Sequence, residues 1–174
     1  MGLFSFLFKK KNDDNEEIFD YYNNRLSIDL NNQGININGK TVSLPATFED
    51  FSFLGTPRKI KTDAGVNYAW DDAGVYCYTR GEEKTVVCFG IAVKKGEMDL
   101  KTNPKSLYDG ELTINGREWQ SEISKGENTE VFTRIICGEY CVVAEYCEFM
   151  DSSAYSVVEI QKADRADGLE FLNN

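Results

Sequence analysis

The chain has 174 residues, of which 29 are acidic and 19 basic, and its formal net charge is -10. It contains no histidine, which excludes Ser-His-Asp triads, Cys-His dyads and histidine-ligated metals. A surface this negative repels phosphate, so nucleic acid is not expected as a partner. No set of nucleophile, base and orienting residue can be assembled from the motifs. We therefore predict a protein that is not an enzyme, with no catalytic residue, no metal site and no cofactor.

The N-terminal residues predict a flexible segment over 1–17, followed by a single α+β domain over 18–174. In Leu3–Lys11 the lysines follow a short apolar run, which is the reverse of a secretory signal. We therefore expect a cytoplasmic protein. The run is too short to span a bilayer, and a membrane is not expected as a partner. A frayed or docked N-terminal turn is favoured, with attachment to a membrane surface as the alternative.

The first third of the chain predicts a helix start in the acidic run 12–17 and then a half-buried strand. Leu26, Ile28 and Leu30 alternate with polar residues, as on a strand with one buried face. Next, Asn38-Gly39 supplies the positive φ angles of a tight hairpin turn. A similar phrase recurs over 112–119, which indicates either a second Asn-Gly hairpin or an old duplication.

A short helix and a β-meander are predicted for the middle of the chain. Thr47 is a candidate N-cap, and Gly55 with the following Pro57 ends the helix. Strands are then expected over 66–70 and 75–78, joined by a turn at 71–74. The strand over 86–93 is apolar on both faces, which places it near the middle of a sheet.

The last third predicts a hairpin of strands 131–136 and 140–146, a final strand over 155–160 and a short helix in the tail from Ala163 to Asn174. Together these elements indicate the α+β class, with a mainly antiparallel sheet built of meander and hairpins and two or three short helices. Five cysteines occur without any CxxC pair: Cys77, Cys88, Cys137, Cys141 and Cys147. Buried reduced thiols in a reducing compartment are the expected state.

The candidate binding residues lie in and around the meander. Adjacent carboxylates at Asp71 and Asp72 can bind basic groups, although Asp-Asp-Ala-Gly is also good turn chemistry. Glu82 and Glu83 form a second acidic turn. Tyr76 and Tyr78 share one strand face, which suits either a protein interface or cross-strand packing within the sheet.

The stretch from Phe51 to Val93 carries a family resemblance. Leu54-Gly-Thr-Pro-Arg58, Trp70-Asp-Asp-Ala-Gly74 and the apolar strand that follows resemble an uncharacterised family of bacterial proteins with the pattern helix, LGxPxR, Trp-Asp-Asp-x-Gly turn and paired strand. Residues 108–116 are similar to a further glycine-bounded element of that family. More distantly, the unit is similar to modules of β-lactamase-inhibitor-like proteins, which bind by a sheet face.

Such bacterial proteins resemble the immunity proteins of polymorphic toxin systems. The resemblance implies a cytoplasmic protein that binds a cognate toxin and occludes its active site. A cationic toxin such as a nuclease would suit the acidic charge, with Asp71, Asp72, Glu82 and Glu83 in the place of phosphate and Tyr76 and Tyr78 beside them. The alternative function is a non-catalytic structural or adaptor module at the inner membrane surface. The oligomeric state is left open, since an exposed edge strand can pair two copies.

Overall fold

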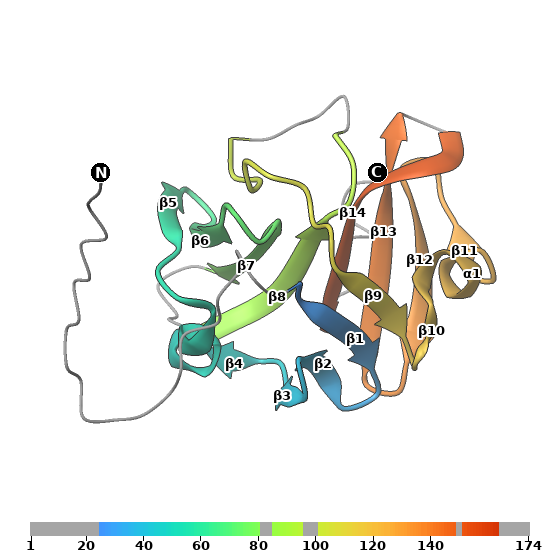
Figure 1. The fold of residues 1–174 in the computed structure, drawn as a ribbon. Coiled ribbons are helices and arrows are strands. Elements are labelled where there is room, and N and C mark those ends of the chain that lie inside the picture. The colour runs from blue at the N-terminus through green and yellow to red at the C-terminus, as the bar shows by residue number, and fades with distance from the viewer. Residues whose placement is uncertain (1–24, 81–84, 96–100, 149–150, 164–174) are drawn as a thin grey trace, which may run out of the picture.

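The computed structural model describes residues 25–80, 85–95, 101–148 and 151–163 and shows two facing β-sheets (Figure 1). Among these residues 57% lie in strands and 10% in two helices. The expected α+β class is therefore wrong, and the described part of the chain is mainly β. The reason is the length of the helices: the 3-10 helix η1 (Phe48–Leu54) and helix α1 (Trp119–Ile123) are too short to form a layer of their own.

The smaller sheet has the strand order β10-β9-β1-β2-β3. Its strands are β1 (Ser27–Asn31), β2 (Gly34–Ile37), β3 (Lys40–Val42), β9 (Glu111–Ile114) and β10 (Arg117–Glu118). The first strand lies at the centre, antiparallel to β2 and parallel to β9. Segments more than eighty residues apart in the chain therefore meet at the middle of this sheet, where Asp29 pairs with Thr113.

Both predicted Asn-Gly hairpins are confirmed, and both belong to this small sheet. Asn38 and Gly39 turn with φ angles of 50° and 87°, and Asn115 and Gly116 with 53° and 69°. These positive values match the twist of the flanking strands. One hairpin lies on each side of β1, so local turn chemistry sets the two outer strands of the sheet.

The larger sheet has the order β11-β12-β13-β14-β8-β7-β6-β5, with β4 paired to β8. Its strands are β4 (Ala46–Thr47), β5 (Arg58–Thr62), β6 (Gly65–Trp70), β7 (Val75–Arg80), β8 (Thr85–Ala92), β11 (Glu127–Asn128), β12 (Phe132–Cys137), β13 (Tyr140–Glu148) and β14 (Asp151–Lys162). Its pairings are antiparallel. The central position predicted for the apolar strand β8 is confirmed, because it lies between β7 and β14.

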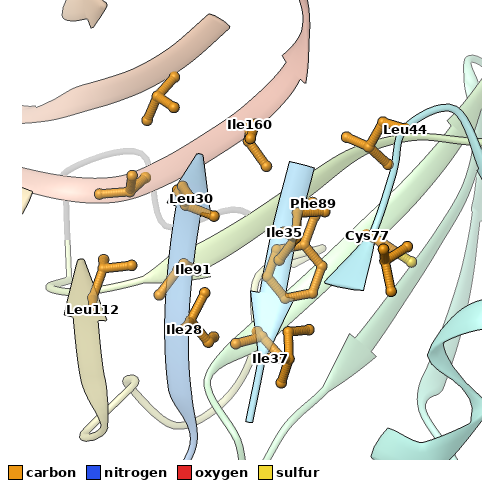
Figure 2. Packing of buried hydrophobic residues seen from close by; sticks show 14 of the residues in the cluster. Ile28, Leu30, Ile35, Ile37, Leu44, Cys77, Phe89, Ile91, Leu112 and Ile160 are labelled. Atoms are coloured by element: carbon orange, nitrogen blue, oxygen red, sulfur yellow. The ribbon is translucent and has the colours of Figure 1, made fainter. Parts of the chain in front are cut away.

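The space between the two sheets holds the hydrophobic core (Figure 2). Ile28, Leu30 and Ile35 of the small sheet are fully buried against the large sheet. From the large sheet, Phe89 and Ile160 point into the same layer. Alternate residues of each strand therefore face the core, as the period of two requires, and we name this side of the large sheet its inner face.

Helix η1 closes one end of this core. The backbone N–H of Thr47 donates to Asp50 Oδ2 at 2.8 Å, which fixes the first turn. Phe51 is fully buried and stacks on Phe89 with 5.5 Å between ring centroids. Gly55 ends the helix with a φ angle of 80°. The predicted helix is thus present, wound as a 3-10 helix.

Some elements differ from the sequence-based expectation. Strands β5 and β11 and helix α1 were not predicted. The predicted helix start in 12–17 and the tail helix lie outside the described residues. All five cysteines are buried and none forms a disulfide, so the prediction of buried thiols is confirmed.

Candidate functional site on the outer face of the large sheet

The second side of the large sheet, which we name its outer face, differs in chemistry from the inner face. Strand register places one row of residues side by side across five strands: Ala69 on β6, Tyr76 on β7, Gly90 on β8, Glu159 on β14 and Val143 on β13. These residues alternate with those that face the core. The row brings a phenol and a carboxyl from distant parts of the chain onto one line.

Tyr76 and Glu159 are joined by a hydrogen bond across the intervening strand. The Tyr76 hydroxyl donates to Glu159 Oε1 at 2.6 Å. Gly90 lies between them in the register, and a Cβ there would come within 2.2 Å of Tyr76 Cζ. The glycine therefore leaves the room through which the ring reaches the carboxyl, as expected where a side chain crosses a strand closely.

Burial raises the pKa values of the polar side chains around Gly90. The pKa of Glu159 is raised to about 7, chiefly by burial and then by the nearby charge of Glu145, while the hydrogen bond from Tyr76 lowers it. Burial also raises the pKa of the Tyr76 hydroxyl and of the Cys88 thiol. The charge of Cys88, followed by burial, raises the pKa of Tyr78. At neutral pH the two phenols and the thiol are therefore protonated.

The chemistry open to this group is proton exchange and hydrogen bonding. The carboxyl of Glu159 titrates near neutral pH, whereas Tyr76, Tyr78 and Cys88 are held in their neutral forms, in which they are poor nucleophiles. Within the described ranges, no group of three or more His, Cys, Asp or Glu side chains is arranged to hold a metal ion. Tyr76 and Glu159 thus use their hydrogen-bonding capacity on each other.

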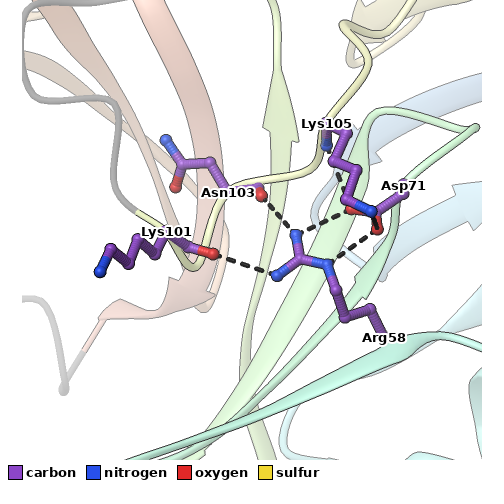
Figure 3. A network of polar contacts seen from close by, with 5 residues as sticks. All are labelled: Arg58, Asp71, Lys101, Asn103 and Lys105. Carbon is purple, nitrogen blue, oxygen red and sulfur yellow. Dashed lines mark hydrogen bonds and ion pairs between the residues drawn. The ribbon is translucent and has the colours of Figure 1, made fainter.

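A second polar network borders the outer face at the end of β6 (Figure 3). The guanidinium of Arg58 donates through Nε and Nη2 to the two carboxylate oxygens of Asp71, both at 2.8 Å. The same guanidinium donates to the carbonyl oxygens of Lys101 and Asn103. The backbone N–H of Lys105 completes the set on Asp71. These bonds tie the 101–105 loop to strands β5 and β6.

The network also fixes the charge of its acid. The hydrogen bonds from Arg58 hold the pKa of Asp71 below its usual range, with Lys105 contributing in the same direction. Both partners are partly buried, with side-chain exposures of 29% for Arg58 and 20% for Asp71. Asp71 is therefore an ionised, internally paired carboxylate.

The other residues of the motif stretch are structural in the same way. The indole of Trp70 donates to the Gly55 carbonyl at 3.0 Å. Gly74 has a φ angle of 67°, and a Cβ on it would come within 2.2 Å of the backbone nitrogen of Tyr108. We name Gly55, Arg58, Trp70, Asp71 and Gly74 the clasp. It joins the end of η1, the meander and the 101–108 loop into one corner of the fold.

Four of the six candidate binding residues lie within the described ranges, and their surroundings differ. Asp71 is engaged in the clasp, Asp72 is exposed beside it, and Tyr76 is only 4% exposed. Tyr78 is half-buried. Glu82 and Glu83 lie outside the described residues.

Sequence reasoning missed Glu159, Cys88 and Gly90 as members of the site. Glu159 alternates with apolar neighbours in β14, which is the pattern of an ordinary solvent-facing position. The one local signal is Gly90, because a glycine inside an apolar strand often marks a close approach. The partner that approaches it, Tyr76, is fourteen residues away, so pattern alone does not identify it.

Fold and site together define a mainly β, two-sheet protein with a hydrogen-bonded Tyr76–Glu159 pair on the outer face of its larger sheet. The chain belongs to the family described as "Domain of unknown function (DUF7738)", which matches residues 27–129. This range covers β1 to β11 and therefore the whole clasp, whereas Glu159 lies beyond it. Searches of curated proteins and of solved structures find no match.

The adaptor alternative rests on residues 3–11, which lie outside the described ranges. None of the helices in the described part of the chain has the length and apolar character needed to cross a membrane.

Proposed function

We propose that this chain is an immunity-type protein, which binds a cognate bacterial toxin in the cytoplasm and occludes its active site. It acts by binding and not by turnover. The observation that carries the proposal is the clasp, which holds an exposed acidic turn rigidly at one corner of an acidic protein. The motif of that corner also carries the resemblance to an uncharacterised bacterial family, and that family suggests immunity proteins.

The clasp supports binding through preorganisation. Asp71 accepts hydrogen bonds from Arg58 and from the backbone N–H of Lys105. These bonds hold the backbone of the turn in place, and the adjacent Asp72 belongs to the same turn. A rigid turn loses little conformational entropy when a partner binds. Asp72 is exposed, and it is the residue of the pair that we expect to contact a basic group of the toxin.

The overall charge supports a cationic partner. A net charge of -10 accelerates encounter with a positively charged protein and makes the association rate depend on salt. A toxin that binds phosphate, such as a nuclease, has a basic cleft of this kind. The acidic turn would then occupy the place of phosphate in that cleft.

The test is co-expression with the product of the adjacent gene. We expect this chain to rescue growth when that product is toxic, and the purified proteins to form a complex whose association rate falls with added salt. Failure both to rescue and to bind would contradict the proposal.

A charge-reversal pair locates the contact. Asp72→Lys should weaken the complex at least tenfold, whereas Glu118→Lys makes the same change of charge on exposed edge strand β10 and should leave affinity within about threefold. Equal losses in the two variants would show that only net charge matters and would remove Asp72 from the interface.

A further inference from the structure

Strand β5 is the longest of the four described strands that end the two sheets. The large sheet ends at β5 and β11, and the small sheet at β3 and β10. β5 has five residues, whereas β3 has three and β10 and β11 have two each. Within the described ranges no strand pairs with β5 on the side away from β6, and Figure 1 shows β5 at the margin of the fold. Very short edge strands resist pairing with another chain, so β5 is the edge at which a further strand can pair.

The register shows which backbone groups β5 directs outward. Along an antiparallel strand, the N–H and C=O groups of successive residues point alternately to one neighbouring strand and to the other. Val66 on β6 points its N–H toward β7, where it donates to Thr79 Oγ1 at 3.2 Å. Its partner on β5, Lys61, therefore directs its N–H and C=O away from β6, and Lys59 does the same two residues earlier. The edge thus presents two donors and two acceptors to a further strand.

The same two residues place cations on one face of the edge. Lys59 and Lys61 are exposed, and as alternate residues of a strand they project on the same side of the sheet. The Lys59 ammonium lies over the ring of Tyr68, 5.4 Å from its centroid. That ring stacks on Phe48 with 4.4 Å between centroids, so the first cation rests on a packed aromatic pair.

The opposite face of β5 has an apolar residue between the two lysines. Ile60 is half-buried beside Asn67 of β6, and a side chain of a further strand can pack against it. Arg58 is already engaged by Asp71 and adds no free cation. No acid occurs from Arg58 to Thr62. The central part of the edge therefore alternates cation, apolar residue and cation.

The charge of this edge selects among possible strands. The chain as a whole carries -10, but screening acts over about 8 Å at physiological ionic strength, so Lys59 and Lys61 dominate direct contacts. Antiparallel pairing of two copies centred on Ile60 would set Lys59 opposite Lys61, and like charges directly opposite destabilise a sheet. Carboxylates in those positions would instead form favourable cross-strand pairs.

We propose that the β5 edge binds an extended acidic segment of another protein, which joins the large sheet as an antiparallel strand with a carboxylate opposite Lys59 and another opposite Lys61. The residue between the two acids contacts Ile60. Backbone hydrogen bonds supply affinity, and the alternation of side chains supplies specificity. The inference does not depend on the toxin-binding proposal.

Amide hydrogen exchange followed by NMR reports on the edge directly. In the free protein the amides of Lys59 and Lys61 should exchange fast, whereas those of Ile60 and Thr62, which face β6, should exchange slowly. The probe is the peptide Glu-Val-Glu-Val-Glu with acetyl and amide ends. At about ten times its dissociation constant, it should slow exchange at Lys59 and Lys61 about tenfold.

Methylation of the peptide nitrogens separates strand pairing from charge attraction. The glutamates that lie opposite the lysines direct their N–H groups to β5, so N-methyl groups on the glutamates should abolish protection. N-methyl groups on the valines point away from β5 and should leave the protection in place. The peptide Lys-Val-Lys-Val-Lys should not protect the native edge.

A charge-reversal pair tests the two lysines. Lys59→Glu combined with Lys61→Glu should lose the glutamate peptide and bind the lysine peptide instead. Lys94→Glu combined with Lys95→Glu makes the same change of charge at exposed residues after β8, and its affinity for the glutamate peptide should stay within about threefold of the native value.

Three results would overturn the proposal. The first is an absence of peptide-dependent protection at Lys59 and Lys61 in the folded protein. The second is binding that survives methylation of the glutamate nitrogens, which would be charge attraction without an added strand. The third is protection of both amides that rises with protein concentration in the absence of peptide, which would assign the edge to a second copy.

Discussion

The two faces of the large sheet use the same strands for opposite purposes. On the inner face, residues such as Phe89, Ile91 and Ile160 are fully buried, and they stabilise the fold by packing and by the burial of apolar surface. On the outer face, the alternate positions hold Gly90 and Glu159, whose contribution depends on one specific hydrogen bond. The inner face therefore supplies stability, whereas burial on the outer face costs stability because it raises the pKa of the Glu159 carboxyl to about 7.

Substitutions on the inner face should lower the free energy of unfolding most. Phe51→Ala removes a fully buried ring that stacks on Phe89, and we expect the free energy of unfolding to fall by about 3–5 kcal/mol. Phe53→Ala is the matched control on the same helix, because its side chain is only half-buried, and it should cost clearly less. Equal losses in denaturant titrations would contradict the assignment of the inner face.

Adding a side chain to the crowded outer face should cause the next largest loss of stability. Gly90→Ala places a methyl group where the Tyr76 ring lies, and we expect a loss of about 2–3 kcal/mol, because the ring must shift and release Glu159. In a Tyr76→Ala background the same glycine change should cost little. A double-mutant cycle with no coupling would show that the two residues do not share this space.

The pH dependence of stability tests the raised pKa of Glu159. An unfolded glutamate loses its proton near its ordinary pKa of 4.5, whereas folded Glu159 keeps it to about pH 7. Between these values the folded state binds more protons, so its stability falls as pH rises. Glu159→Gln should remove this slope and gain about 2 kcal/mol relative to wild type between pH 5 and pH 8.

Urea titrations at both pH values measure that gain. Glu118→Gln, on an exposed position of β10, should leave the slope unchanged. A wild-type slope that persists in Glu159→Gln would place the titrating group elsewhere.

The smallest losses of stability are expected at the two neighbouring acids Asp71 and Asp72, and these losses should differ. Asp71→Asn weakens two charge-assisted bonds from Arg58 and should cost about 1–2 kcal/mol. Asp72→Asn changes an exposed side chain and should stay within about 0.5 kcal/mol. Thermal unfolding of the pair decides between them, and a larger loss for Asp72→Asn would reverse their roles.

The elements that local sequence determines were predictable. Asn38-Gly39 and Asn115-Gly116 require positive φ angles, and β8 is apolar on both faces, so two hairpins and one central strand follow from short windows of sequence. The pairing of β1 with β9 and the entry of β14 beside β8 depend on segments far apart in the chain, and no local pattern encodes them. Strand β5 was missed because Arg58–Thr62 alternates weakly and follows a proline.

The candidate site also has a part that sequence predicted and a part that it did not. Asp71 and Asp72 were found because they are adjacent, but their different roles depend on Arg58, thirteen residues from Asp71. Tyr76 was recognised as an aromatic on a strand face, whereas its partner Glu159 is eighty-three residues away. Residue type identified Asp71 and Tyr76 as polar candidates, and only the three-dimensional fold identified their partners, Arg58 and Glu159.

The position of β14 has a consequence during synthesis. β8 is complete by Ala92, yet its neighbour on one side is drawn from Asp151–Lys162, and the family match ends at residue 129. While the ribosome makes the intervening residues, the nascent chain carries an apolar strand with an open edge, which is a template for aggregation. We expect fragments that stop at the family boundary to be recovered in inclusion bodies, and chaperone demand to end only when the last strand has emerged.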